Sequence, residues 1–125
     1  MFRAALAFTL ILGLTACGGL GPFTDSSEGE TVQVHVGDTF VVQLPGNPTT
    51  GYTWEVVPAE VPVCVQVGEP VFTPESDALG APGTFEFTFE ITAVGTEDLT
   101  LIYRRPWEED VEPLDTFTLR LEASG

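Results

Sequence analysis

A chain of 125 residues is long enough for one compact domain and leaves little room for a second. It has nineteen acidic side chains against four arginines and no lysine, and its formal net charge is −15 at pH 7. Because such a surface repels phosphate backbones, we expect no nucleic-acid partner. The hydrophobic fraction of 43%, with 13 glycines and 10 prolines, favours short strands separated by many turns.

The beginning of the chain has the pattern of an export signal. Arg3 supplies a positive charge, and the apolar run from Ala4 to Leu14 is shorter than the roughly 20 residues that a membrane span needs. The run ends in Leu14-Thr15-Ala16-Cys17, which resembles the lipobox of bacterial lipoproteins. In that motif the signal peptide is cut before the cysteine, which then carries a lipid. An ordinary signal peptide, which would leave Cys17 an incidental thiol, is the alternative.

The sequence therefore predicts three parts. Residues 1–16 are expected to form a lipoprotein signal peptide, and residues 17–30 a lipidated Cys17 followed by a flexible tether rich in Gly, Ser and acid. Residues 31–123 are expected to form the folded domain. The lipobox resemblance implies an exported protein that is anchored to the membrane of the bacterial cell envelope through Cys17, facing the periplasm or the cell exterior.

Alternating apolar and polar residues predict β-strands throughout the domain. The clearest alternation puts Phe85, Phe87, Phe89 and Ile91 on one face. A turn at Gly95-Thr96 is expected to make this strand half of a hairpin. With no helix and no repeat, the pattern predicts an all-β, immunoglobulin-like β-sandwich of about seven to eight strands. The predicted strands cover residues 31–36, 39–44, 52–57, 63–73, 84–93, 98–103 and 115–123.

Residues with reactive side chains are assigned structural roles. Cys64 lies in a run of alternating valines, residues 61–67, and is expected to be a small buried hydrophobe. His35 is the single histidine of the sequence, so neither a His-bearing catalytic triad nor a multi-His metal site is expected. The acidic run from Glu108 to Asp115 lacks the spacing of a calcium loop, and a solvated loop is the preferred interpretation. We expect no enzyme activity, metal or cofactor.

Three connections, residues 45–51, 74–83 and 104–114, are longer or chemically richer than a hairpin needs. If residues 63–73 form a single bent strand, two antiparallel strands separate each connection from the next. All three would then lie at the same end of the sandwich and form a composite binding edge. If Gly68-Glu69-Pro70 reverses the chain instead, the middle connection moves to the opposite end.

Each connection carries a motif. The first reads NPTTGYTW over residues 47–54, with Thr49-Thr50 at its tip between a proline and a glycine that favour a tight turn. The second reads LGAPGT over residues 79–84, and the third contains Arg105-Pro106-Trp107. In this order and at this spacing, the three motifs resemble those of the chagasin-type inhibitors of cysteine peptidases. The resemblance covers nearly the whole predicted domain.

The resemblance implies a reversible, competitive inhibitor whose three loops occlude the active-site cleft of a papain-like cysteine peptidase. The threonine tip would enter the centre of the cleft, the glycine-rich loop would bond to the enzyme's substrate-binding strand, and Trp107 would be an aromatic anchor. Pro82 departs from the family pattern, where a glycine is common, and lacks an N–H donor. The implied peptidase-binding residues are Asn47, Pro48, Thr49, Thr50, Gly51, Tyr52, Gly80, Ala81, Pro82, Gly83, Arg105, Pro106 and Trp107.

A second function remains open at this point. A non-catalytic envelope module that binds polysaccharide or protein would use the same sandwich, with Trp107 as a sugar platform. On physical grounds alone, the NPTTG segment is also consistent with a well-made turn that has no partner, and Trp107 with packing over the end of the sandwich. Under either function we expect a monomer without catalytic residues.

Overall fold

The computed structural model describes residues 20–125, so the predicted signal peptide and Cys17 lie outside the described residues. Within residues 20–125 the chain forms strands and two short 3₁₀ turns, and no helix there has the length and apolar character to cross a membrane. The elements are β1 (Leu20–Thr24), η2 (Asp25–Ser27), β2 (Thr31–His35), β3 (Thr39–Gly46), η3 (Pro48–Thr50), β4 (Thr53–Val56), β5 (Cys64–Gln66), β6 (Val71–Pro74), β7 (Gly83–Ile91), β8 (Gly95–Arg104) and β9 (Asp115–Ser124).

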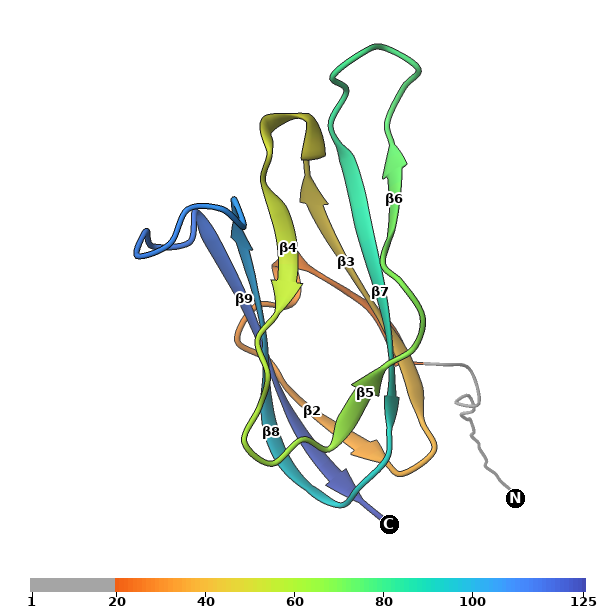
Figure 1. Ribbon diagram of the computed structural model, residues 1–125. Helices are drawn as coiled ribbons and strands as arrows, with labels where there is room; N and C mark the ends of the chain where they lie inside the picture. The colour runs from red at the N-terminus through yellow and green to blue at the C-terminus, as the bar shows by residue number, and fades with distance from the viewer. Residues whose placement is uncertain (1–19) are drawn as a thin grey trace, which may run out of the picture.

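The strands form two sheets packed face to face, which confirms the all-β sandwich (Figure 1). One sheet has the order β1-β3-β7-β5, with β6 pairing on the same side of β7 as β5 but further along it. The other sheet has the order β2-β9-β8-β4. Most neighbours are antiparallel, and the two parallel pairs, β1 with β3 and β2 with β9, involve the first two strands.

The core lies between the sheets and is built from the residues that the alternation selects. On β7, Phe85, Phe87, Phe89 and Ile91 are buried, while the Thr and Glu residues between them face outward. Burial of each such side chain stabilises the fold by about 1.5–3 kcal/mol relative to exposure. Trp54 is also buried, and its indole N–H donates to the Pro45 carbonyl oxygen at 3.0 Å.

The segment before residue 31 differs from the prediction of a flexible tether. Residues Leu20–Thr24 form strand β1, which pairs in parallel with β3. The physical reason is burial: the Phe23 ring packs edge-on against Phe40 with centroids 5.7 Å apart, and Leu20 packs against the core. Gly21 and Pro22 interrupt the alternation between these two apolar residues, so the polar composition concealed the strand.

The predicted hairpin at Gly95-Thr96 is also wrong. Strand β7 belongs to one sheet, and β8 pairs with β9 and β4 in the other, so the chain crosses between the sheets after Ile91. Gly95 itself begins β8 opposite Ala123. Alternation along two successive strands shows which face of each strand is apolar. It does not distinguish two strands that pair in one sheet from two that face each other across the core, because both arrangements give the same pattern.

The segment from residue 63 to residue 73 decides where the loops lie. Strands β5 and β6 both pair antiparallel with β7, so the chain keeps its direction through Gly68-Glu69-Pro70. Gly68 has a φ of 74°, and the interruption is a local break in pairing without a reversal. The condition for three loops at one end is therefore met.

Cys64 is buried with 7% of its surface exposed, as its valine-rich surroundings predict. Its thiol lies 3.6 Å from the Glu97 carboxylate, which also accepts the Val63 main-chain N–H at 2.8 Å. Burial, followed by the charge and hydrogen bond of Glu97, raises the pKa of the Cys64 thiol to about 12. The thiol is therefore protonated at neutral pH, which excludes a role as a nucleophile.

Candidate functional site

The three motif-bearing loops lie at one end of the sandwich, at the top of Figure 1. Strand register sets their positions. Gly46 at the end of β3 pairs with Gly83 at the start of β7, which brings the first loop beside the glycine-rich loop. Thr53 at the start of β4 pairs with Arg104 at the end of β8, which brings the first loop beside the third. The first loop is therefore central.

The tip of the first loop is a capped 3₁₀ turn, η3. Asn47 is its N-cap, with extended backbone, and its side-chain oxygen accepts the Thr49 N–H at 3.1 Å and the Thr49 hydroxyl at 2.6 Å. Pro48 occupies the first position of the turn, where its fixed φ is favourable. Gly51 ends the turn with a φ of 88°, a left-handed conformation that favours glycine.

A side-chain bond joins the first loop to the glycine-rich loop. The Asn47 amide nitrogen donates to the Gly80 carbonyl oxygen at 2.9 Å, across 33 residues of sequence. Gly80 has a φ of 76°. At Gly83, an added Cβ would collide with the main chain of Thr73 and Pro74, so glycine is required by the close approach of β6. Both glycines of this loop therefore have a structural role: Gly80 adopts a positive φ, and Gly83 makes room for β6.

Pro82, the departure from the expected motif, fits this hairpin. Its carbonyl oxygen accepts the Glu75 N–H at 2.9 Å, which closes the loop next to the Pro74–Gly83 pair. The left-handed residue of the loop is Gly80, so proline is not required to adopt a positive φ. The effect of the missing N–H on a partner stays a prediction.

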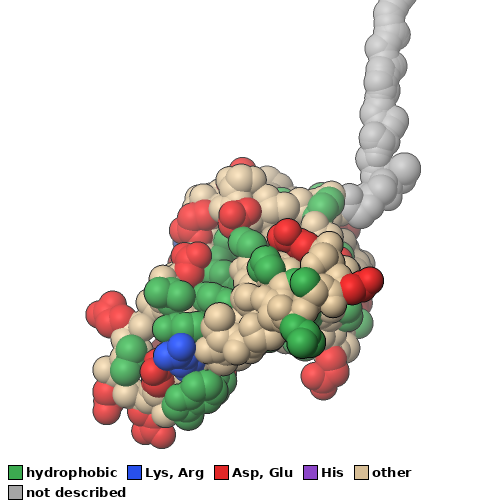
Figure 2. All heavy atoms as spheres, turned by 90° about the horizontal axis from the view of Figure 1, so that it is seen from above, with side chains coloured by type: hydrophobic (Ala, Val, Ile, Leu, Met, Phe, Trp, Pro, Cys, Tyr) green, Lys and Arg blue, Asp and Glu red, His purple; other side chains and the backbone are tan. Residues whose placement is uncertain are grey.

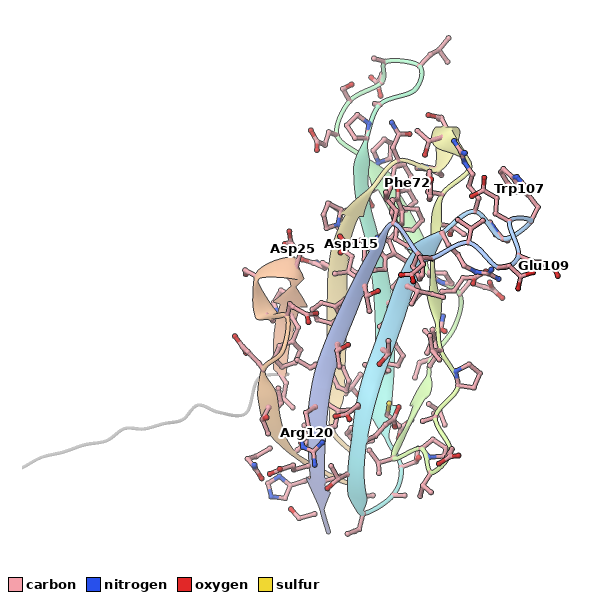
Figure 3. All side chains as sticks on the ribbon, turned by 90° about the vertical axis from the view of Figure 1, so that its left-hand side faces the viewer. Asp25, Phe72, Trp107, Glu109, Asp115 and Arg120 are labelled. Carbon is pink, nitrogen blue, oxygen red and sulfur yellow. The ribbon has the colours of Figure 1, made fainter. Side chains whose placement is uncertain are left out.

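The third loop is held to the first by Arg105 and Trp107. The Arg105 Nε donates to the Thr50 carbonyl oxygen at 3.1 Å, and the guanidinium lies over the Tyr52 ring, 4.6 Å from its centroid. Trp107 lies against Gly51 so closely that a Cβ there would collide with the indole. Trp107 is nevertheless 67% exposed, and Figure 3 shows its side chain projecting from the loop beside Glu109.

Arg105 is one of the implied peptidase-binding residues, and the structure shows that it also has an internal role. Besides Thr50, it contacts Glu108, whose carboxylate lies 3.4 Å from Nη1. Arg104 is likewise paired with Glu55 at 2.8 Å. Figure 2, which views the molecule from above, shows acidic side chains spread around the outline and basic side chains at one place.

Two residues of this end were missed by the sequence reasoning. Tyr103, assigned only to a strand, accepts the Asn47 N–H on its hydroxyl at 2.8 Å and stacks on Tyr52 with centroids 5.3 Å apart. The sequence carries no signal for this role of Tyr103, because its partners come close only through the pairing of β4 with β8. Leu79, at the tip of the glycine-rich loop, is fully exposed. The sequence feature that could have identified it is a large apolar residue within a polar loop.

The structure brings the thirteen predicted site residues together at this edge, on three loops that are linked through Asn47, Arg105 and Trp107. Residues 20–125 hold no group of three or more His, Cys, Asp or Glu side chains that could bind a metal. A rigid β-sandwich that presents a composite loop edge is the architecture of a binding protein.

Comparison with known proteins gives the family. Residues 33–121 match the chagasin family of peptidase inhibitors, I42, and the chain belongs to this family of inhibitors, which are not enzymes. It is 38% identical over 105 residues to chagasin of Trypanosoma cruzi, covering 81% of this chain and 96% of chagasin. The crystal structure of the cysteine protease inhibitor EhICP2 from Entamoeba histolytica is similar, with a TM-score of 0.71, 28% identity, and coverage of 82% of this chain and 93% of that one.

A more distant structure shares the fold. PbICP-C, solved in complex with falcipain-2, has a TM-score of 0.54 at 16% identity, covering 86% of this chain and 95% of its own. At this identity the likeness concerns the arrangement of strands.

Proposed function

We propose that this chain is a reversible, competitive inhibitor of papain-like cysteine peptidases that occludes the active-site cleft with its three linked loops. The observation that carries the proposal is the bonding of both outer loops to the central tip, in a chain that belongs to an inhibitor family. The similar protein EhICP2, which is named as a cysteine protease inhibitor, supports the choice of target class.

The geometry of the tip explains how it would block a peptidase without being cleaved. Peptidases bind substrates as extended strands and need the peptide bond in an attack geometry. The tip is a closed 3₁₀ turn, in which Thr50 N–H donates to the Asn47 carbonyl and Gly51 N–H to the Pro48 carbonyl. Because these bonds form when the protein folds, binding costs little further ordering.

The outer loops would grip the enzyme on either side of the cleft. On one side, Gly80, Ala81 and Pro82 present main chain with few side chains, which allows close approach of a neighbouring strand. Gly83, at the base of this loop, is buried and pairs with Gly46 and Pro74. On the other side, the exposed indole of Trp107 offers an aromatic anchor of the type that dominates interface energies. Pro106 restricts the backbone between Arg105 and Trp107.

We further propose that the mature protein is a lipoprotein, exported and anchored to the cell envelope through Cys17. The support is the Leu14-Thr15-Ala16-Cys17 motif after an apolar run. Expression in a bacterial host with a labelled fatty acid tests this: wild-type protein should carry the label in the membrane fraction, and Cys17→Ser should not. Equal labelling of both would exclude Cys17 as the anchor.

The central test of inhibition is tight-binding titration of papain with residues 20–125. Thr49→Glu puts a long charged side chain at the tip and should abolish inhibition, because the cleft would have to bury an unpaired charge. Thr92→Glu, an exposed position in the connection at the opposite end, is the matched control and should inhibit like the wild type. Full papain activity at micromolar wild-type protein would reject the proposal.

A further inference from the structure

Glu97 is the one polar or charged residue that is buried among residues 20–125, with 7% of its surface exposed. Its side chain faces inward from β8, in the same alternation as the buried Leu99 and Leu101. None of the ion pairs within the described residues involves its carboxylate. Because removing a charge from water is costly unless the charge is paired, this carboxylate favours a cationic partner from outside the chain.

Only one of the two Glu97 carboxylate oxygens is used inside the protein. Oε1 accepts the Val63 main-chain N–H at 2.8 Å and lies 3.6 Å from the Cys64 thiol. No donor among residues 20–125 bonds to Oε2. A carboxylate oxygen has two lone pairs, so Oε2 keeps its full capacity to accept hydrogen bonds from a ligand.

Glu97 lines a cavity of about 190 Å³, formed where the connection from β4 to β5 crosses from one sheet to the other (Figure 1). The cavity is large enough for a small organic molecule, since a dry cavity of about 150 Å³ holds benzene. Because part of its lining is exposed, it is open to solvent. The buried lining includes Phe89, Glu97 and Leu99, and the exposed lining includes Pro58, Pro62 and Gln66.

The lining selects one class of ligand. An anion would be repelled by Glu97, and a purely apolar molecule would leave the carboxylate buried without a partner. A divalent cation needs several oxygen ligands, and residues 20–125 hold no group of three or more His, Cys, Asp or Glu side chains that could supply them. A primary ammonium group donates to Oε2, and a short aliphatic chain fits the apolar walls at Phe89 and Leu99.

We propose that this cavity binds a small aliphatic primary amine, whose ammonium group pairs with Glu97 and whose chain lies between the sheets. A second hollow beside Glu97 is lined by Glu60 and Asp98, whose charges also favour a cation. The site is separate from the loop edge, because the stretch of β8 from Glu97 to Arg104 spans roughly 20 Å. The proposal therefore does not depend on inhibition of a peptidase.

NMR titration of residues 20–125 at pH 7 with four small molecules tests the proposal. The main-chain amide signals of Val63, beside the carboxylate, and Leu99, in the cavity wall, report on the site. n-Pentylamine should shift both signals with a dissociation constant of about 1 mM. 1-Pentanol lacks the charge and should bind at least about tenfold more weakly, because it cannot pair with the carboxylate. Pentanoate should not bind.

Methylamine controls for general attraction of cations to the acidic surface. It carries the same charge without the chain, and should also bind at least about tenfold more weakly than n-pentylamine. Equal binding of n-pentylamine and 1-pentanol, or of n-pentylamine and methylamine, would overturn the proposal. An absence of shifts with all four molecules would show that the cavity holds water only, and would overturn it too. These comparisons use the wild-type protein and need no variant.

Glu97→Gln tests the carboxylate itself. Glutamine keeps the shape of the side chain and removes its charge, so binding of n-pentylamine should weaken at least about tenfold. Glu90→Gln is the matched control, because Glu90 is an exposed carboxylate on β7 outside the cavity, and this variant should bind like the wild type. Unchanged binding by folded Glu97→Gln, or equal losses in the two variants, would overturn the proposal.

Discussion

The Asn47 side chain lies between two loops and bonds to both of them. Its oxygen accepts the Thr49 N–H and hydroxyl within the central loop, and its nitrogen donates to the Gly80 carbonyl oxygen of the glycine-rich loop at 2.9 Å. One carboxamide therefore shapes the tip and fixes the distance to its neighbour. The donated bond can be separated experimentally from the two accepted ones, because aspartate keeps the acceptor and loses the donor.

Asn47→Asp should keep the shape of the tip but release the glycine-rich loop. We expect the inhibition constant for papain to rise about fivefold, equivalent to about 1 kcal/mol for one hydrogen bond, mainly through faster dissociation. Asn47→Ala removes all three side-chain bonds and should have a larger effect. Surface plasmon resonance measures the rates, and equal effects of the two variants would show that the bond to Gly80 contributes nothing.

Gly51→Ala should weaken inhibition by displacing Trp107. A Cβ at this position meets the indole, and the φ of 88° is unfavourable for alanine. Gly68→Ala is the matched control, because Gly68 also has a positive φ, 74°, but has open space around it. Both should lose about 1 kcal/mol of unfolding free energy, while Gly51→Ala alone should raise the inhibition constant. Equal inhibition by both variants would contradict the role of the Trp107 contact.

Phe23→Ala tests whether β1 belongs to the fold. The ring packs edge-on against Phe40 at a centroid distance of 5.7 Å, so its removal should lower the unfolding free energy by about 1–3 kcal/mol. Inhibition should be unchanged, because β1 contributes no residue to the three loops. Urea denaturation measures the first effect, and an unaltered midpoint would restore the interpretation of this segment as a tether.

Cys64 should make stability depend on pH in the alkaline range. Burial and Glu97 raise the pKa of the thiol from 9.0 to about 12 in the folded state. The folded protein therefore holds this proton more tightly than the unfolded chain, so the contribution to stability is complete below about pH 9 and declines as the pH rises towards 12. Urea denaturation from pH 8 to pH 11 should show a steeper decline for the wild type than for Cys64→Ala.

The thiol itself provides a second measurement. A thiol reagent at pH 8 should label Cys64 in residues 20–125 only after unfolding, because the folded state both buries it and keeps it protonated. Rapid labelling under native conditions, or parallel pH profiles for the wild type and Cys64→Ala, would contradict the buried environment.

The sequence alone was sufficient for the features that depend on local periodicity and motifs. Alternation along β7 identified which side chains fill the core, and the order of the three motifs indicated the family. The same local patterns could not distinguish pairing within one sheet from packing across two, so the crossing from β7 to β8 was misread as a hairpin. The strand β1 was also missed, since its two apolar anchors are separated by Gly21 and Pro22.

The roles of the site residues were decided by tertiary structure. The motifs indicated which residues belong to the edge, but only the structure shows that Arg105 also bonds to Thr50 and so links two of the loops. Tyr103 supports the tip only because pairing of β4 with β8 places it under Asn47. Hydrogen bonds between loops depend on distances that chain folding sets over many residues, whereas turn chemistry and hydrophobic alternation are properties of a few neighbouring residues.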